Sequence, residues 1–193
     1  SNNQDNNTKD NYIPYCIAFY DVKIKNLDLK AKNLDCLKGI RFIKSSGTVN
    51  NVKIFNSNED SLSAELSELT FNEVNISGSQ DDCIDFESGD YYFKKILLSK
   101  CEDKAIQIKR KANVKIDYLK IDNSSYGLSV HDSSYLIGKE FRIASKKECL
   151  SIYRENDSFY GAKVEIEDEF ICSNNKNFIH KGSKFLIKNV IQN

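Results

Sequence analysis

The chain has 193 residues, with 28 basic and 28 acidic side chains and no net charge at pH 7. This length supports one hydrophobic core, and the balanced charge gives no overall field that would favour nucleic acid or an anionic membrane. No apolar run approaches the roughly 20 residues that a membrane-spanning helix needs. We therefore expect neither nucleic-acid binding nor membrane insertion.

The chain begins with the polar run SNNQDNNTKD. Such a composition cannot bury enough apolar surface to fold, so residues 1–12 are predicted to form a disordered leader. The sequence contains no methionine, even at position 1. We therefore expect the folded part, residues 13–193, to be one domain taken from a larger protein.

Apolar residues then recur about every 22 positions along the chain. They are Ala18, Ile40, Leu62, Ile84, Ile106, Leu128, Leu150 and Cys172. Most are followed two residues later by a second apolar side chain, which is the period of a strand. Most are also preceded by a small residue, which favours a tight bend before each strand.

A second pattern, apolar-x-apolar-x-x-apolar-x-apolar, runs in phase with the first. Its copies include those beginning at Leu69, Tyr91, Val114, Leu136 and Phe159. The extra residue in the middle indicates two short strands joined by a bend, both facing one core, and helical spacing is not sustained anywhere. The sequence therefore predicts an all-β fold, a parallel β-helix of about eight coils with a repeat of about 22 residues.

In this register, the side chains one and three positions after each repeat residue face outward. They are Arg41 and Ile43, Ser63 and Glu65, Asp85 and Glu87, Gln107 and Lys109, Ser129 and His131, and Ser151 and Tyr153. Rows of such groups at the rise of about 4.8 Å between coils can bind an extended polysaccharide. The alternative is an ordinary polar surface on a soluble solenoid.

The corner before each of these strands is rich in carboxylates, with Asp60 on one coil and Asp81 and Asp82 on the next. In an inverting glycoside hydrolase one carboxylic acid protonates the leaving oxygen while others activate water, and this cluster suits that chemistry. Like charges this close also raise one pKa. The alternative is a ladder of ion-paired turn residues, such as Asp82 with Lys104.

Cations on the same face suit a different reaction, because a uronate lyase or epimerase needs a positive charge near the substrate carboxylate. Lys104 or Lys109 could supply it, while His131 or Tyr153 moves a proton and Asp132 fixes the tautomer of His131. The predicted catalytic residues are therefore Asp60, Asp81, Asp82, Lys104 and His131. The predicted substrate-binding residues are Asp85, Glu87, Gln107, Lys109, Asp132, Tyr153 and Arg154.

No cofactor or metal is expected. Calcium could bind the oxygens of Asp81, Asp82, Asp85 and Glu87, but no ligand loop of recognisable spacing supports such a site. The six cysteines form no Cys-x-x-Cys pair, and they could be buried thiols or disulfides. Cys149 and Cys172 are predicted to be buried packing thiols.

The repeat resembles the right-handed parallel β-helix proteins of the pectate-lyase-like superfamily, from about Tyr15 to Ile191. Its corners are similar to polygalacturonase motifs, since Asn58-x-Asp60 matches Asn-x-Asp and Gln80-Asp81-Asp82-Cys83 matches Gln-Asp-Asp-Cys. The resemblance implies a right-handed winding of the coils, a carbohydrate context and a link between Cys83 and Cys101. Lys104 stands where that family has His, and Ser129 and His131 stand where it has Arg-x-Lys, so its substrate-binding guanidinium is absent.

The chain also looks like uncharacterised bacterial β-helix repeat proteins with coils of the type Asp-Asp-x-Ile-Asp, present here at residues 81–85. That resemblance implies the fold and a glycan context. We expect a non-catalytic domain whose partner is a polysaccharide or another part of a larger protein. The alternative is a polysaccharide-active enzyme, either a glycoside hydrolase, a uronate lyase or an epimerase. The compartment stays open, with an extracellular or cell-surface location favoured.

Overall fold

The computed structural model describes residues 13–188, so the predicted leader at residues 1–12 and the last residues, 189–193, lie outside the described residues. Strands make up its regular structure, and none of the described residues belongs to a helix long and apolar enough to cross a membrane. The strands are β1 (Tyr15–Tyr20), β2 (Lys23–Leu34), β3 (Lys38–Ile43), β4 (Ser46–Ser57), β5 (Asp60–Ser79), β6 (Ile84–Cys101), β7 (Lys104–Ser124), β8 (Tyr126–His131), β9 (Tyr135–Ser145), β10 (Leu150–Tyr153), β11 (Lys163–Cys172), β12 (Asn177–Ile179) and β13 (Lys184–Ile187).

The strands stack as a parallel β-solenoid of about eight turns, as the repeat predicted. One continuous path of paired strands runs β1-β3-β5-β6-β7-β8-β10-β12, and we call its outer surface the front face. The strands β2, β4, β9, β11 and β13, with the later parts of β5, β6 and β7, form what we call the rear face.

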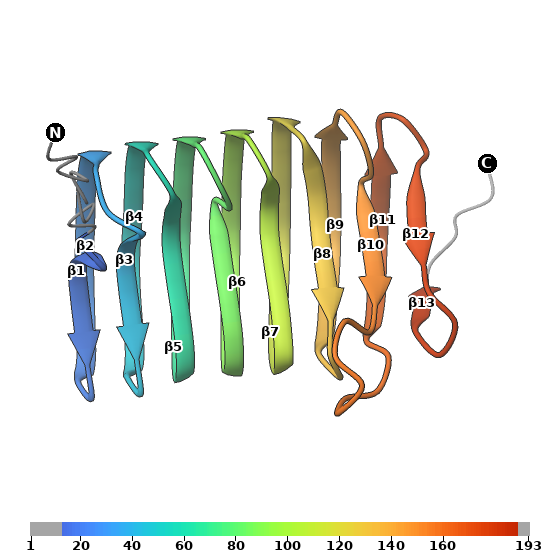
Figure 1. The fold of residues 1–193 in the computed structure, drawn as a ribbon, viewed down its shortest axis with the longest axis horizontal. Helices are drawn as coiled ribbons and strands as arrows, with labels where there is room; N and C mark the ends of the chain where they lie inside the picture. The colour runs from blue at the N-terminus through green and yellow to red at the C-terminus, as the bar shows by residue number, and fades with distance from the viewer. Residues whose placement is uncertain (1–12, 189–193) are drawn as a thin grey trace, which may run out of the picture.

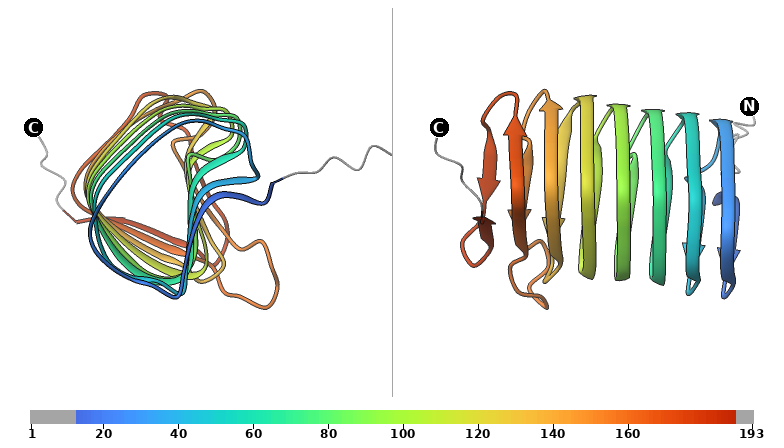
Figure 2. Two further views of the ribbon diagram at one scale, coloured as in Figure 1. Left: turned by 90° about the vertical axis from the view of Figure 1, so that its left-hand side faces the viewer. Right: turned by 180° about the vertical axis from the view of Figure 1, so that it is seen from behind.

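Figure 1 shows the winding of these coils. The chain descends along the front strands and returns upward along the rear strands while it advances from the N-terminal to the C-terminal end, so the solenoid is right-handed (Figure 1). Seen along the axis, the coils superpose as one closed outline, and a single orange loop projects from it (Figure 2). This loop is residues 154–162, between β10 and β11.

The register of the central coils is the one that the sequence predicts. Leu62 pairs with Ile84, Ile84 with Ile106, Ile106 with Leu128, and Leu128 with Leu150. Each of these side chains is buried, together with the second apolar residue of its strand. The inward row therefore forms the core, and the residues between point away from it. Several of these outward residues are nevertheless buried by their neighbours, namely Ser63, Asp85, Ser129, His131 and Ser151.

The register at both ends differs from the prediction. Ile17, not Ala18, pairs with Ile40, because the corner between Leu34 and Lys38 has one residue more than the corresponding corner of the next coil. At the C-terminal end, the projecting loop adds residues, so Leu150 pairs with Asn177 rather than with Cys172.

The same insertion displaces the second pattern in its last full copy. Val164 pairs with Leu136, so the copy begins at Val164 and not at Phe159. The period of 22 residues holds only where no corner gains or loses a residue.

Aromatic side chains fill the middle of the core. Phe71 stacks on Phe93 with ring centroids 4.8 Å apart, and Phe86 stacks on Phe93 at 5.3 Å. All three rings are fully buried. Stacked rings at the same height in neighbouring coils fix the distance between the front and rear strands.

The bends that follow β3, the front parts of β5, β6 and β7, and β8 each place one or two residues in the left-handed backbone region. Lys44, Leu66, Ser88, Arg110 and Asp132 occupy the first such position of each bend, with φ between 43° and 55°. This conformation is uncommon for residues other than glycine. Because five different residue types adopt it at the same place, the geometry of the coil imposes the bend, and no particular residue type is needed there. This bend places Asp132 directly after the last residue of β8.

Three disulfides connect the six cysteines: Cys16 with Cys36, Cys83 with Cys101, and Cys149 with Cys172. The second is the link that the family resemblance implied. The prediction of packing thiols at Cys149 and Cys172 is wrong, because the ends of β11 and the start of β10 come together with their Cα atoms 5.8 Å apart. That distance suits a disulfide.

Candidate functional site

The front face carries an outward row at a spacing of 22 residues, just before or at the start of each strand. This corner row comprises Lys38, Asp60, Asp82, Lys104, Tyr126 and Glu148. Its first four members are charged, and the two acids lie between the two lysines. The sequence analysis had identified Asp60, Asp82 and Lys104, but it had missed the outer members, although they follow the same spacing.

The acids of the corner row accept hydrogen bonds from the backbone of the next coil. The Asp82 amide donates to Asp60 Oδ1 at 3.2 Å, and the Lys104 amide donates to Asp82 Oδ1 at 2.9 Å. Both carboxylates are buried, and the Lys38 ammonium contacts Asp60. These acids therefore satisfy backbone donors that the tight corners would otherwise leave without partners.

Asp85, one row further along the strands, is held between two lysines. Lys38 Nζ lies 2.9 Å from its Oδ2, and Lys109 Nζ lies 2.8 Å from its Oδ1. Burial alone would raise the pKa of Asp85, but the charges of Lys109 and Lys38 outweigh burial and lower it. Asp85 is thus ionised and fully occupied by its neighbours.

The other predicted binding residues of the central coils are also engaged. Glu87 Oε1 lies 2.5 Å from Arg110 Nη1, and Gln107 accepts a hydrogen bond from Lys109 Nζ at 3.0 Å. Asp85, Glu87 and Gln107, together with the acids Asp60 and Asp82 of the corner row and the cations that contact them, form what we call the charged ladder. In it, each carboxylate faces a cation or a hydrogen-bond donor. This is the ion-paired arrangement that the sequence analysis had kept as an alternative.

Asp60, Asp81 and Asp82 come together at the corner, with one oxygen from each within 4.8 Å of the others. Burial raises the pKa of Asp82 to about 7, and the Lys104 ammonium, 3.7 Å away, opposes this rise. Lys104 itself lies closer to Asp103, at 2.5 Å. The carboxylates are closer than the roughly 6.5–9.5 Å that inverting hydrolases leave for a water molecule.

His131 and its neighbours form a separate cluster towards the C-terminal end. The His131 ring stacks on the Tyr153 ring at 4.7 Å with a 6° angle between planes, and Ser129 Oγ lies 3.1 Å from the Tyr153 hydroxyl. His131 Nδ1 lies 3.1 Å from Asp132 Oδ2 and 3.5 Å from Glu155 Oε2.

The environment of this cluster keeps His131 neutral. Burial lowers the pKa of His131, against the opposing charge of Asp132. Arg154, the last predicted binding residue, points into the projecting loop, where its Nη2 lies 3.1 Å from Asp157. The predicted constellation thus divides into the charged ladder and the His131 cluster.

A hollow of about 450 Å³ lies on the front face over the start of β7 and over β8, β10 and β12, and we call it the front hollow. It is lined by Asp103, Lys104, Tyr126, Ser129, Glu148, Ser151, Tyr153 and Phe178. Only Lys104 and Tyr153 belong to the predicted site. The spacing of 22 residues from Lys104 could have identified Tyr126 and Glu148 in the sequence. It could not have identified Phe178, because the register of β12 is shifted by inserted residues.

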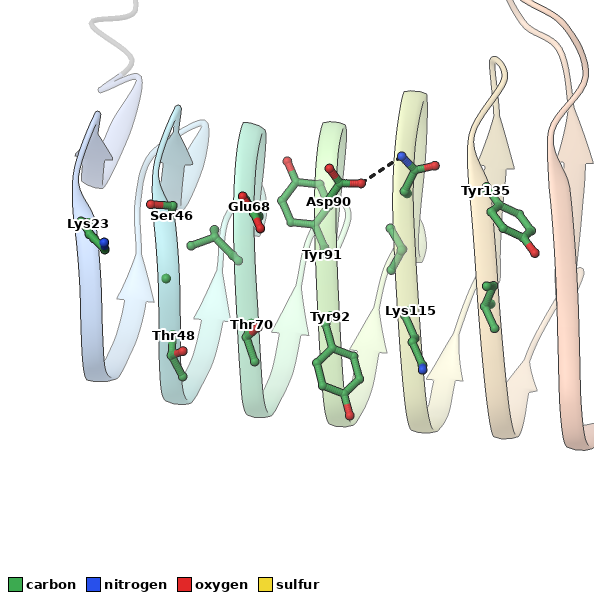
Figure 3. A pocket seen from close by; sticks show the side chains of 15 residues that line it. Lys23, Ser46, Thr48, Glu68, Thr70, Asp90, Tyr91, Tyr92, Lys115 and Tyr135 are labelled. Carbon is green, nitrogen blue, oxygen red and sulfur yellow. Dashed lines mark hydrogen bonds between the residues drawn. The ribbon is translucent and has the colours of Figure 1, made fainter.

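A longer groove of about 590 Å³ crosses the coils on the rear face (Figure 3). Its polar lining includes Lys23, Ser46, Thr48, Glu68, Thr70, Asp90, Tyr92, Asn113, Lys115 and Tyr135. Part of this lining is already paired, since Asn113 donates to Asp90 at 3.0 Å and the Tyr92 hydroxyl donates to Asp117. The sequence analysis had not considered this face.

The chain has no match among protein-family models, curated proteins or solved structures.

Proposed function

We propose that this domain binds a glycan in the front hollow and does not cleave it. The observation that carries the proposal is the lining of the hollow, where three aromatic rings, from Tyr126, Tyr153 and Phe178, meet charged and hydroxyl side chains. Sugars present apolar C–H faces and a rim of hydroxyl groups. An aromatic floor with polar edges complements both surfaces.

The charged groups at the hollow favour a sugar that carries a carboxylate. Lys104 lines the hollow, and Lys147 Nζ lies 4.5 Å from the centre of the Tyr126 ring. Lys147 can pair with a uronate, and Lys104 can do so in exchange for its contact with Asp103. Glu148, which accepts a hydrogen bond from Ser151, has a second oxygen that can accept from a sugar hydroxyl group. The volume of the hollow also lies within the range of about 300–1,000 Å³ that is typical of small-ligand sites.

The state of the acidic corner supports binding rather than cleavage. Asp60 is paired with Lys38, Asp85 is held by two lysines, and Asp82 accepts the amide of the next coil. Hydrolysis needs one carboxylic acid and one base that both reach the glycosidic bond. A carboxylate that already compensates a buried cation is a poor base, because protonating it would leave that cation unpaired.

Two further features fit a carbohydrate context. The corner motifs resemble those of polygalacturonases, within a fold similar to the pectate-lyase-like superfamily, although a fold by itself does not determine a function. The three disulfides fit an extracellular or cell-surface location, since disulfides persist in oxidising compartments.

Glycoside cleavage is the second candidate function, and one observation favours it. The pKa of Asp82 is raised to about 7 by burial, which would suit a general acid near neutral pH. Asp82 lies next to Lys104, which lines the front hollow. A substrate bound in the hollow would therefore approach this acid.

Binding is tested by titrating the chain with oligosaccharides of polygalacturonate, alginate and neutral xylan, using calorimetry. We expect saturable binding of at least one uronate-containing glycan. Tyr126→Ala and Phe178→Ala should each weaken it by about tenfold, which corresponds to about 1.4 kcal/mol.

The controls are two aromatic residues elsewhere. Tyr160 is 85% exposed in the projecting loop, and Tyr92 lines the rear groove, so neither substitution should change affinity. Loss of binding in Tyr92→Ala alone would move the site to the rear face and contradict the proposal. The same mixtures are assayed for reducing ends, and product that disappears in Asp82→Asn would establish the second candidate instead.

A further inference from the structure

Three potential metal ligands converge where β8 ends. His131 is the last residue of β8, Asp132 occupies the left-handed bend after it, and Glu155 comes from the projecting loop. One ligand atom from each lies within 4.8 Å of the other two. His131 is 1% exposed, whereas the Glu155 side chain is 67% exposed, so the cluster lies at the surface with its histidine on the inner side.

His131 has no hydrogen-bond partner among the described residues, at either ring nitrogen. Buried imidazole nitrogens are normally satisfied, because a buried nitrogen without a partner loses the hydrogen bonds it made with water. Its Nδ1 nevertheless faces the two carboxylate oxygens, at 3.1 Å and 3.5 Å. The nitrogen is directed into the cluster, where Asp132 Oδ2 is close to it but outside the geometry of a well-formed hydrogen bond.

These separations match the edges of a metal coordination sphere. Zinc binds histidine nitrogen and carboxylate oxygen at about 2.0–2.2 Å. Two ligands at that distance, separated by an octahedral or tetrahedral angle, lie about 3.0–3.5 Å apart. An ion could therefore bind all three atoms with little movement of His131 or Asp132.

The second oxygen of Asp132 holds the cluster in place. Asp132 Oδ1 accepts hydrogen bonds from the backbone amides of Glu155 and Asn156, at 2.8 Å and 3.0 Å. These bonds tie the projecting loop to the bend and turn Oδ2 towards His131. Outer contacts of this kind orient the ligands of metal sites.

Cations of the described residues reach the cluster only at longer range: the pKa of Arg110 is raised first by its hydrogen bond to Glu87 and in part by the charge of Asp132, but Arg110 forms its ion pair with Glu87. Among residues 13–188, neither Asp132 nor Glu155 forms an ion pair with a lysine or an arginine. The nearby Lys109 ammonium is held by Asp85, and Arg154 is held by Asp157. The other acidic group, Asp60, Asp81 and Asp82, differs because the Lys38 ammonium already contacts it.

We propose that His131, Asp132 and Glu155 bind a divalent first-row transition metal, with Zn²⁺ as the best match for one imidazole and two carboxylates. Three protein ligands leave at least one coordination position open to solvent on the Glu155 side. The ion would fix the projecting loop against the end of β8, beside the Tyr153 ring that also lines the front hollow. This inference does not depend on glycan binding.

The test uses the full chain without an affinity tag, treated with EDTA and dialysed into chelator-free buffer at pH 7.5. Calorimetric titration with ZnCl₂ should give one ion per chain. His131→Asn and Glu155→Gln should each weaken binding by at least about tenfold. Titration with Co²⁺ gives a second readout, because its visible absorption reports the ligands directly and should change in the same variants.

Each variant has a matched control. His180→Asn removes the other histidine of the chain, which is exposed, and Asp157→Asn removes a carboxylate of the same loop that is 97% exposed. Both should bind Zn²⁺ like the unmodified chain. Because Glu155 is exposed, Glu155→Gln should fold normally and decides the outcome if His131→Asn does not fold.

Two results would overturn the proposal. The first is the absence of saturable binding up to about 1 mM Zn²⁺, which corresponds to a binding free energy weaker than about 4 kcal/mol. The second is binding that persists unchanged in both His131→Asn and Glu155→Gln, or that is lost in His180→Asn.

Discussion

The two halves of the front face are built from the same kind of coil, but they differ in how their outward polar side chains are paired. Over β3, β5, β6 and β7, every outward carboxylate of the charged ladder meets a lysine, an arginine or a backbone amide. Over β8, β10 and β12, aromatic rings border an open hollow, and the buried His131 has no hydrogen-bond partner within residues 13–188. The regular half contains the recognisable acidic motif, and its carboxylates Asp60, Asp82, Asp85 and Glu87 already pair with cations or backbone amides.

The insertion in the second half explains the contrast. The projecting loop and the shifted register bring Phe178 and Glu155 beside residues of the regular rows, where the repeat alone would not place them. A repeated row tends to pair with itself from coil to coil. At the departure from the repeat, the ring nitrogens of His131 lack a hydrogen-bond partner among the described residues.

The largest expected effect concerns the core beneath the two halves. Phe71→Ala should lower the free energy of unfolding by about 3–5 kcal/mol, because its ring is fully buried and stacks on Phe93. Phe178→Ala should change it by less than about 1 kcal/mol, since that ring is 47% exposed. Urea titration followed by circular dichroism measures both. Equal losses would mean that Phe178 is a core residue and not part of a binding surface.

The next effect concerns the charged ladder. Asp85→Ala should cost about 3 kcal/mol, because it leaves Lys38 and Lys109 partly buried without their shared partner. Asp157→Ala, which removes an exposed carboxylate of the loop, should cost less than about 0.5 kcal/mol. The same denaturation experiment compares them. A cost below about 1 kcal/mol for Asp85→Ala would contradict a structural ladder.

A smaller effect depends on pH. The pKa of Asp82 is raised from 3.8 to about 7 in the folded chain, so the folded state binds a proton that the unfolded state has lost. The stability contributed by this proton is complete below pH 4 and is lost as the pH rises towards 7.

Asp82→Asn should therefore match the unmodified chain at pH 4 and exceed its free energy of unfolding at pH 8. We expect a gain of about 1–2 kcal/mol, after the lost attraction to Lys104 is subtracted. Denaturation at the two pH values measures the difference. A variant that is less stable at pH 8 would show that the attraction to Lys104 outweighs the cost of burying the charged carboxylate, and it would contradict the raised pKa of Asp82.

The sequence predicted the solenoid and the central register because a regular repeat records which side chains face the core. It also identified Asp60, Asp82 and Lys104 as neighbours, since equal spacing means adjacent coils. It could not place Phe178, because inserted residues break the spacing without a local signal. It offered His131 or Tyr153 as the group that moves a proton, and it did not identify Glu155 as a neighbour of His131. Glu155 lies in a loop, and the repeat does not predict the path of a loop.

The most direct measurement compares glycan affinity in Asp81→Asn/Asp82→Asn with that in Tyr126→Ala/Phe178→Ala. Both double variants are first checked by circular dichroism for native folding. We expect the acidic variant to bind like the unmodified chain and the aromatic variant to lose at least about tenfold in affinity. A folded acidic variant that loses binding while the aromatic variant retains it would place the ligand at the acidic corner and contradict the division of the front face described above.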